Sequence, residues 1–168
     1  YYSAGSFPRN IMEGEYQPIC NKSETFIEYL NDCGSREVAD ISASMKVIWL
    51  GNATIQVDII IENNEAFDYN GHVRASITEI ISRYNTYFGE PYHYGFLGFA
   101  FDKDISIPGR GVFEDNMTWN GNEHMDNHGN NFGDIDPDNI QVTMGVLNDD
   151  DGFADETTMS YVESNDPP

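Results

Sequence analysis

Positive charge is scarce in this sequence. Its 168 residues contain 8 Lys and Arg against 29 Asp and Glu, which gives a formal net charge of −21 at pH 7. A protein whose main partner is a nucleic-acid backbone or an anionic membrane needs clustered Lys and Arg, so the charge excludes both partner classes. Apolar residues still make up 39% of the chain, which is enough for a folded core and argues against wholesale disorder. The length fits one domain, with or without a small appendage.

Long hydrophobic runs are absent as well. No run approaches the roughly 18 apolar residues that cross a bilayer, and Ile59–Ile61 is only strand-sized. We therefore expect no membrane insertion. The sequence begins at Tyr1 without Met and without a signal-peptide pattern, which is expected of a processed product or of a fragment.

Cysteine is nearly absent, with Cys20 and Cys33 thirteen positions apart. This number and spacing exclude a zinc ribbon, and no Cys-x-x-Cys redox motif occurs. Two alternatives stay open: a disulfide, worth about 3 kcal/mol for a loop of this length, or two buried thiols. The acidic, lysine-poor and Asn-rich composition is typical of extracellular proteins and favours the disulfide. Three glycosylation sequons, at Asn21, Asn52 and Asn116, suit secretion but also arise by chance in an Asn-rich chain.

Alternating apolar residues predict β-strands after residue 40. The clearest case is the stretch 55–61, where Ile and Val alternate with polar residues and predict a half-buried strand. Strands are also predicted at residues 45–49, 73–77, 96–101 and 140–146, with a closing edge strand at 157–162. The stretches between them are predicted loops: aromatic at 84–94, acidic and rich in Asn and Gly at 114–138, and acidic at 148–156.

The first 35 residues differ from the rest. Ser23 can cap a short helix with Phe26, Leu30 and Cys33 on one face, and Glu13-Gly14 predicts a tight hairpin. Helix near the start and many short strands after it predict a mainly β fold. We expect a small α/β element at residues 1–37 and an antiparallel β-sandwich with long acidic loops at 38–168.

Two groups of residues resemble a known family. The first resembles the second half of a thioredoxin-like domain and consists of Tyr1-Tyr2, Gly5, Phe7-Pro8, the Glu13-Gly14 turn, the helix ending at Cys33, and Arg36. The second resembles the β-sandwich that follows such a domain and consists of Gly71-His72-Val73-Arg74, Thr78-Glu79, Ser82-Arg83, Tyr92-His93, Phe96-Leu97 and Thr118-Trp119. Together they resemble the secreted archaeal and bacterial thioredoxin-like proteins that carry a C-terminal immunoglobulin-like domain.

The resemblance has consequences for fold and activity. It implies an immunoglobulin-like sandwich at residues 38–168, and a cis-proline at Pro8 before a strand of the thioredoxin sheet. The family's redox pair lies in the half of the thioredoxin fold that these 168 residues do not contain, so oxidoreductase activity is not carried over. Half a sheet also leaves strand edges that need cover.

Two acidic loops suggest calcium. Side-chain oxygens at alternate positions, as a calcium loop needs, occur at Asp134, Asp136 and Asp138, and less completely at Asp149, Asp151 and Asp155. Neither loop matches the full EF-hand pattern, and a solvated acidic turn explains each loop alone equally well. A folded domain at −21 repels itself, however, and divalent cations relieve that repulsion. We therefore predict at least one bound Ca²⁺, at the first loop.

An aromatic cluster and a histidine pair are the other candidate sites. The cluster comprises Tyr84, Tyr87, Phe88, Tyr92 and Tyr94, and two readings stay open: a contact surface for carbohydrate or protein, or a satellite core under a loop. The histidines lie four positions apart, at 124 and 128, but the surrounding Asn and Gly disfavour a helix, and Met stands where a zinc protease needs its Glu. We expect no catalytic residues.

Together these features predict a secreted, non-catalytic, calcium-binding structural protein. We expect it to assemble with copies of itself into a filament or tube, through strand addition and Ca²⁺ at the subunit contacts. Two alternatives remain. In the first, the chain would be the C-terminal part of a secreted thiol-disulfide oxidoreductase. In the second, it would be a sandwich module that binds a glycan or a peptide through the stretch 84–94.

Overall fold

Seven β-strands make up most of the part of the chain that the computed structural model describes, which is residues 27, 31 and 34–163. In chain order the strands are β1 (Ile41–Gly51), β2 (Thr54–Asn63), β3 (Tyr69–Asn85), β4 (Pro91–Ile107), β5 (Val112–Asn120), β6 (Ile140–Asn148) and β7 (Ala154–Glu163). Two short 3₁₀ helices, η1 (Gly121–Glu123) and η2 (Pro137–Asn139), lie between β5 and β6. The prediction of a mainly β chain is confirmed.

The strands form one continuous sheet in the order β4-β3-β6-β7-β1-β2-β5. All neighbouring pairs are antiparallel except β1 and β7, which run parallel and share two registered pairs, Val47 with Val162 and Ile48 with Glu163. The sequence predicted an antiparallel sandwich, and this parallel junction departs from that expectation. The prediction that residues 157–162 form an edge strand is wrong, because β7 is the central strand of the sheet.

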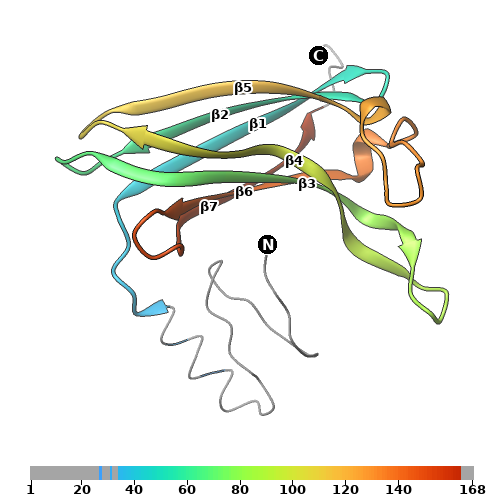
Figure 1. The fold of residues 1–168 in the computed structure, drawn as a ribbon, viewed down its shortest axis with the longest axis horizontal. Helices are drawn as coiled ribbons and strands as arrows, with labels where there is room; N and C mark the ends of the chain where they lie inside the picture. Colours follow the sequence, from blue (N-terminus) through green and yellow to red (C-terminus); the bar gives the residue numbers. More distant parts are fainter. Residues whose placement is uncertain (1–26, 28–30, 32–33, 164–168) are drawn as a thin grey trace.

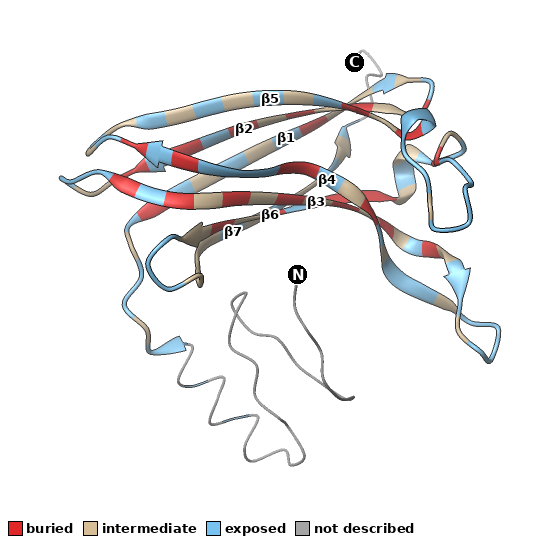
Figure 2. Ribbon diagram, viewed as in Figure 1, coloured by how far each residue is buried: buried red, intermediate tan, exposed pale blue. Residues whose placement is uncertain are grey.

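The sheet curls on itself and encloses the core (Figure 1). Buried residues alternate with more exposed ones along most of the strands, which present an apolar face inward, whereas β7 has no buried residue (Figure 2). The inward-facing side chains of β2 are Ile55, Val57, Ile59 and Ile61. All four are almost fully buried, as the sequence predicted. They join the inward residues of β3 and β6 in a single cluster, so both halves of the curled sheet share one core.

The curl brings the two edge strands, β4 and β5, close to each other. Their side chains bridge the seam: the ammonium of Lys103 on β4 contacts the carboxylate of Asp115 on β5 and lies 5.1 Å from the ring centre of Phe113. Nearby, a Cβ atom at Gly98 would lie only 3.0 Å from Nε1 of Trp119, so the absence of a side chain at Gly98 lets the indole approach β4. The seam is therefore held by side chains.

Two stretches predicted as loops contain strands. Within 84–94 only residues 86–90 form a turn, and the remainder belongs to the β3–β4 hairpin. Within 114–138 the first residues belong to β5. Asp115 hid this strand from the sequence pattern, because it occupies an inward-facing position between Phe113 and Met117, where its charge is matched by Lys103.

Several sequence predictions concern residues outside the described part. These are the hairpin at Glu13-Gly14, the cis-proline at Pro8, the pairing of Cys20 with Cys33, and most of the thioredoxin-like element, so they stay predictions, as does the domain boundary at residue 37. Within the described ranges, no helix has the length and apolar character to cross a bilayer.

Candidate functional site

The β3–β4 hairpin projects beyond the body of the sheet (Figure 1). Aromatic residues occupy its tip. Tyr87 is 98% exposed and Phe88 is 87% exposed, and their rings meet edge to face with centroids 5.6 Å apart. The turn beneath them is well defined, because the amide of Thr86 donates to the carbonyl of Glu90 at 2.7 Å. Gly89 closes the turn at φ 88°, a conformation that favours glycine. The tip thus holds two large rings in water on an ordered support.

Two more tyrosines lie on the β4 arm of this hairpin. Tyr92 and Tyr94 are both more than half exposed. Tyr94 adopts φ 56°, which is a strained value for a bulky residue, although its neighbours His93 and Gly95 pair with β3 in one register. Such outliers persist where the surrounding structure enforces them, and they cluster at functional sites. The exposure of these rings argues against the satellite-core alternative.

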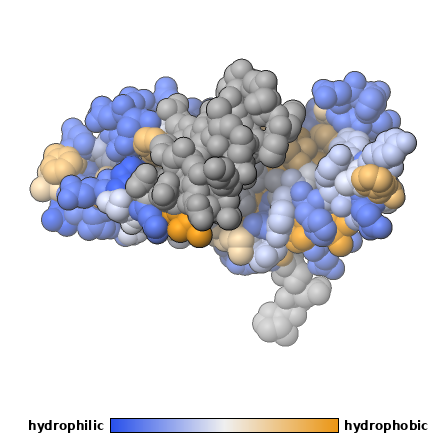
Figure 3. All heavy atoms as spheres, turned by 90° about the horizontal axis from the view of Figure 1, so that it is seen from below, coloured by the Kyte–Doolittle hydropathy of each residue, from blue (hydrophilic) through white to orange (hydrophobic). Residues whose placement is uncertain are grey.

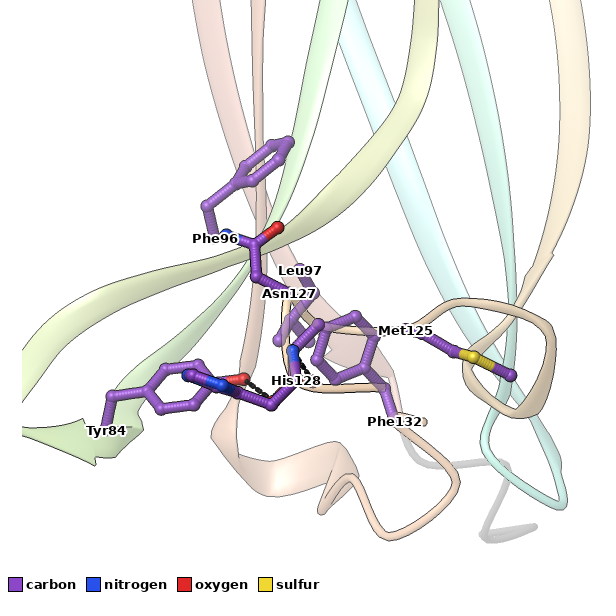
Figure 4. Close-up of a pocket in the computed structure, with 8 residues that line it drawn as sticks. Tyr84, Phe96, Leu97, Met125, Asn127, His128 and Phe132 are labelled. Atoms are coloured by element: carbon purple, nitrogen blue, oxygen red, sulfur yellow. Dashed lines mark hydrogen bonds between the residues drawn. The ribbon is translucent and has the colours of Figure 1, made fainter. Parts of the chain in front are cut away.

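A pocket of about 290 Å³ lies between the base of the hairpin and the loop that follows η1. The residues that line it are Tyr84, Phe96, Leu97, Met125, Asp126, Asn127, His128 and Phe132 (Figure 4). Tyr84, Phe96 and Leu97 form the hairpin side of the pocket, and the ring of Phe96 points away from Tyr84 and His128. Sequence reasoning singled out Tyr84 but did not place the loop of residues 124–132 against it.

Asp126 organises the loop side of the pocket. Its carboxylate accepts hydrogen bonds from the amides of Asn130 and His128, each at 2.8 Å, and from the Tyr84 hydroxyl at 2.8 Å. The side chain of Asn130 adds a fourth at 3.1 Å. The hydrogen bond from the backbone amide of Asn130 is the main reason that the pKa of Asp126 lies well below its usual range, and the other donors lower it further. An Asp that precedes a Gly-containing turn was the sequence signal for this role.

Arg83 ties the hairpin to the same loop. Its guanidinium donates to Glu79 at 2.7 Å and to Asp134 at 2.8 Å, and it lies 5.1 Å from the ring centre of Phe132. The bonds to Glu79 are the main reason that the pKa of Arg83 is raised. On the core side, Trp119 stacks on Phe132, with ring centroids 6.3 Å apart. Loop and hairpin therefore meet through the ion pair of Arg83 with Asp134 and through the ring of Phe132.

The structure gives the acidic residues predicted to bind calcium other partners. Asp134 pairs with Arg83, and Asp136 caps η2 by accepting from the amide of Asp138 at 3.1 Å. The three side chains of this first loop are exposed. Within residues 34–163 no group of three His, Cys, Asp or Glu side chains is arranged to hold a metal ion, so calcium binding stays a prediction.

Asp155, from the second acidic loop, is part of a buried polar cluster. Its side chain is 1% exposed and pairs with Arg36 at 3.2 Å. It also accepts from the Tyr69 hydroxyl at 3.1 Å and from the Asn148 amide group at 2.8 Å. Burial and this carboxylate raise the pKa of Tyr69. Asp151 lies at the edge of the cluster, 3.5 Å from Arg36, while Asp149 is exposed.

The remaining candidates are dispersed. His124 follows η1, stacks on Trp119 with ring centroids 4.9 Å apart and does not lie on a helix with His128. The prediction that the Asn- and Gly-rich surroundings disfavour a helix is confirmed at residues 124–128. Among the sequons, Asn52 lies in the β1–β2 turn at φ 49° and Asn116 lies on β5; both side chains are exposed. Asn21 lies outside the described residues.

No protein-family model and no curated protein matches the sequence. The fold is similar to a domain of the outer membrane lipoprotein Omp28 from Porphyromonas gingivalis, with a TM-score of 0.52, 9% identity, and coverage of 76% of this chain and 92% of that one. Weaker similarity links it to β-glucosidases from Erythrobacter marinus (TM-score 0.46, 11% identity) and Bifidobacterium adolescentis (TM-score 0.44, 12% identity). It covers 74% of this chain in both cases, but only 16% and 17% of theirs. At these identities the similarity concerns the fold alone.

Proposed function

We propose that this chain is a non-catalytic extracellular binding domain whose contact surface is the aromatic hairpin, defined as Tyr84, Tyr87, Phe88, Tyr92 and Tyr94. The observation that carries the proposal is the exposure of Tyr87 and Phe88 at the tip of an ordered hairpin. Rings in water contribute little to folding, whereas aromatic residues dominate the energetics of interfaces. An ordered support also lowers the entropic cost of binding.

The partner class follows from charge and from shape. The net charge of −21 disfavours polyanionic partners. Tyrosine presents an apolar face and a hydroxyl, which suits a neutral glycan or a peptide. The pocket beside Tyr84 would extend the contact surface towards the loop of residues 124–132.

A binding role without catalysis fits the chemistry of the pocket. Its carboxylate, Asp126, already accepts four hydrogen bonds and has a depressed pKa. Such a group is a poor proton carrier near neutral pH, where a general base needs a pKa close to the working pH. The oxidoreductase alternative depends on a redox pair that these 168 residues do not contain. Location outside the cell remains part of the proposal and rests on composition and on the sequons.

The test is a screen of the whole chain against immobilised neutral polysaccharides and against a displayed peptide library. We expect a hit in one of these panels, with Y87A/F88A reducing its affinity by about tenfold or more. The melting temperature should change little, because both side chains are exposed. Phe67→Ala is the matched control, since Phe67 is also exposed but lies outside the strands, between β2 and β3. Binding that survives Y87A/F88A, or the lack of any hit, would contradict the proposal.

A further inference from the structure

The outer surface of the half-sheet β4-β3-β6-β7 carries two cross-strand rows of uncharged side chains. Residues that pair directly across antiparallel strands point to the same side of a sheet. The register therefore places the first row as Phe96–Thr78–Gln141–Tyr161 and the second as Phe99–Ser76–Thr143–Met159. Their neighbours along the strands, such as Val142 and Ile77, point into the core, so the rows lie on the outer side of the sheet. Gln141 is nonetheless buried there, and its side-chain amide donates to Thr143 and to the Met159 sulfur. We call these eight residues the uncharged face.

Four large apolar side chains stand out on this face. Phe96, Phe99, Met159 and Tyr161 are all exposed, and the two phenyl rings meet edge to face with centroids 4.8 Å apart. Single exposed apolar residues are ordinary, whereas clusters mark interaction surfaces. From below, hydrophilic side chains dominate the coloured surface of the molecule, and hydrophobic ones form separate patches (Figure 3). The uncharged face thus holds eight adjacent positions without a charge in a chain with 29 acidic residues.

Two ion pairs border the uncharged face, so its rim carries both positive and negative groups. The next row along β3 and β4 holds Arg74 with Asp102, joined at 2.8 Å. Beside β7, Lys46 of β1 pairs with Glu163 at 3.3 Å. The guanidinium of Arg74 also lies 5.5 Å from the ring centre of Phe99, so the border is continuous with the apolar centre. The result is an apolar centre with a rim that carries positive and negative groups.

We propose that the uncharged face is the surface through which two copies of this chain associate face to face. Two copies at −21 repel each other wherever acidic residues meet, and this face is where they can approach without that repulsion. A two-fold axis opposes the same surface on both copies, so each positive rim group can meet a negative one of its partner. The contact uses residues other than the hairpin tip, and it leaves Tyr87 and Phe88 free for a ligand.

The experiment is sedimentation velocity of the whole chain over a range of concentrations, without divalent cations. We expect the wild type to form dimers. Met159→Glu should weaken association by about tenfold or more, because two like charges then face each other. Met159→Lys should weaken association as well. Because the two variants change the net charge in opposite directions, a loss in both shows that a charge at the face, not the net charge, prevents association. Met159→Glu retains an acceptor for the Gln141 side-chain amide, which lies 3.0 Å from the Met159 sulfur.

Ile60→Glu is the matched control, since Ile60 is an exposed apolar residue on the outer surface of β2, in the other half of the sheet. It should leave the dimer intact. Radical footprinting gives a second readout: Met159 should be protected at high concentration, while Met125, which is 65% exposed in the loop after η1, should react freely. A wild type that is monomeric throughout overturns the proposal, and so does equal dissociation by Ile60→Glu. Protection of Met159 in a monomer would mean that another part of the same chain covers the face.

Discussion

His72 lies between two carboxylates on the outer surface of β3. Its Nδ1 atom is 2.7 Å from Asp104 and its Nε2 atom is 2.8 Å from Asp102, which also accepts from Arg74. Both ring nitrogens can donate only when the imidazole is protonated. Partial burial lowers the pKa of His72, but the two hydrogen bonds outweigh it, and the net pKa is raised above its usual value. The same bonds, from His72 and Arg74, lower the pKa of Asp102.

This geometry predicts a pH-dependent contribution to stability. Because the folded pKa of His72 is raised, the contribution is fully present below the unfolded value of about 6.5 and is lost as the pH rises through the folded value. It also requires ionised Asp102, so it fades as the pH falls below about 4. His72→Gln should therefore lower the free energy of unfolding at about pH 5, by about 1 kcal/mol or less after solvent screening, and much less at about pH 9. Urea unfolding at both pH values measures this.

His93→Gln is the control, since His93 is exposed on β4. The two variants should differ at the acidic pH and converge at the alkaline one. Equal losses for His72→Gln at both pH values would show that the imidazolium makes no special contribution.

At the residue scale, the sequence located the candidate side chains better than it assigned their partners. The aromatic residues were identified as a group, and the structure places them on one hairpin. The acidic residues were grouped by spacing alone. Spacing could not reveal that Asp155 would meet Arg36 and Tyr69, because those partners come from distant parts of the chain. Long-range ion pairs leave no local pattern.

The packing of strand β5 depends mainly on one side chain, Trp119. Trp119 is 1% exposed, contacts Gly98 across the seam, and stacks on His124 and Phe132. It thereby fixes the edge strand and the loop that forms one wall of the pocket. Since large aromatic residues bury the most apolar surface, its loss should affect both elements.

We predict that Trp119→Ala lowers the free energy of unfolding by about 3–5 kcal/mol, the usual cost of removing a buried aromatic ring. The loop of residues 121–133 should also be cut faster by proteases, because His124 and Phe132 lose their stacking partner. Phe113→Ala, further along the same face of β5 and only half-buried, should cost less and leave the loop protected. Denaturant unfolding and limited proteolysis test the two effects separately, and equal behaviour of both variants would contradict the role given to Trp119.

At the element scale, period-two alternation predicted β1, β2, β3 and β6, because one face of each strand is buried against the core. It failed at β5, where an inward Asp interrupts the apolar positions, and at the hairpin tip, where tyrosines occupy both faces in water. It also could not assign β7 to the centre, since strand order depends on pairing between segments far apart in the sequence.

For the whole molecule, net charge is the dominant electrostatic property. At −21 the folded chain repels itself, so added monovalent salt should raise the melting temperature by screening. We propose that calcium does more than salt, as the acidic loops suggest. At matched ionic strength, calcium should raise the melting temperature further and produce species larger than those formed in EDTA.

Differential scanning calorimetry and sedimentation velocity, each in calcium chloride and in sodium chloride of equal ionic strength, check this prediction. Reversal by EDTA is the control for irreversible aggregation. The same melting temperature and the same sedimentation in both salts would reduce calcium to a general screening ion, and the filament or tube expected from the sequence would then be wrong.

The parallel contact between β1 and β7 also has a consequence for how the chain reaches its native state. Val47 pairs with Val162 at the centre of the sheet. This pairing joins β1 and β7, which are synthesised first and last among the seven strands. Contacts of such high sequence separation slow folding, and small all-β domains dominated by them fold in about milliseconds to seconds. Until Ala154–Glu163 leaves the ribosome, β1 and β6 each present an unpaired edge. A chain that is stalled before this point consists of two half-sheets, each with an open side where chaperones or other nascent chains can bind.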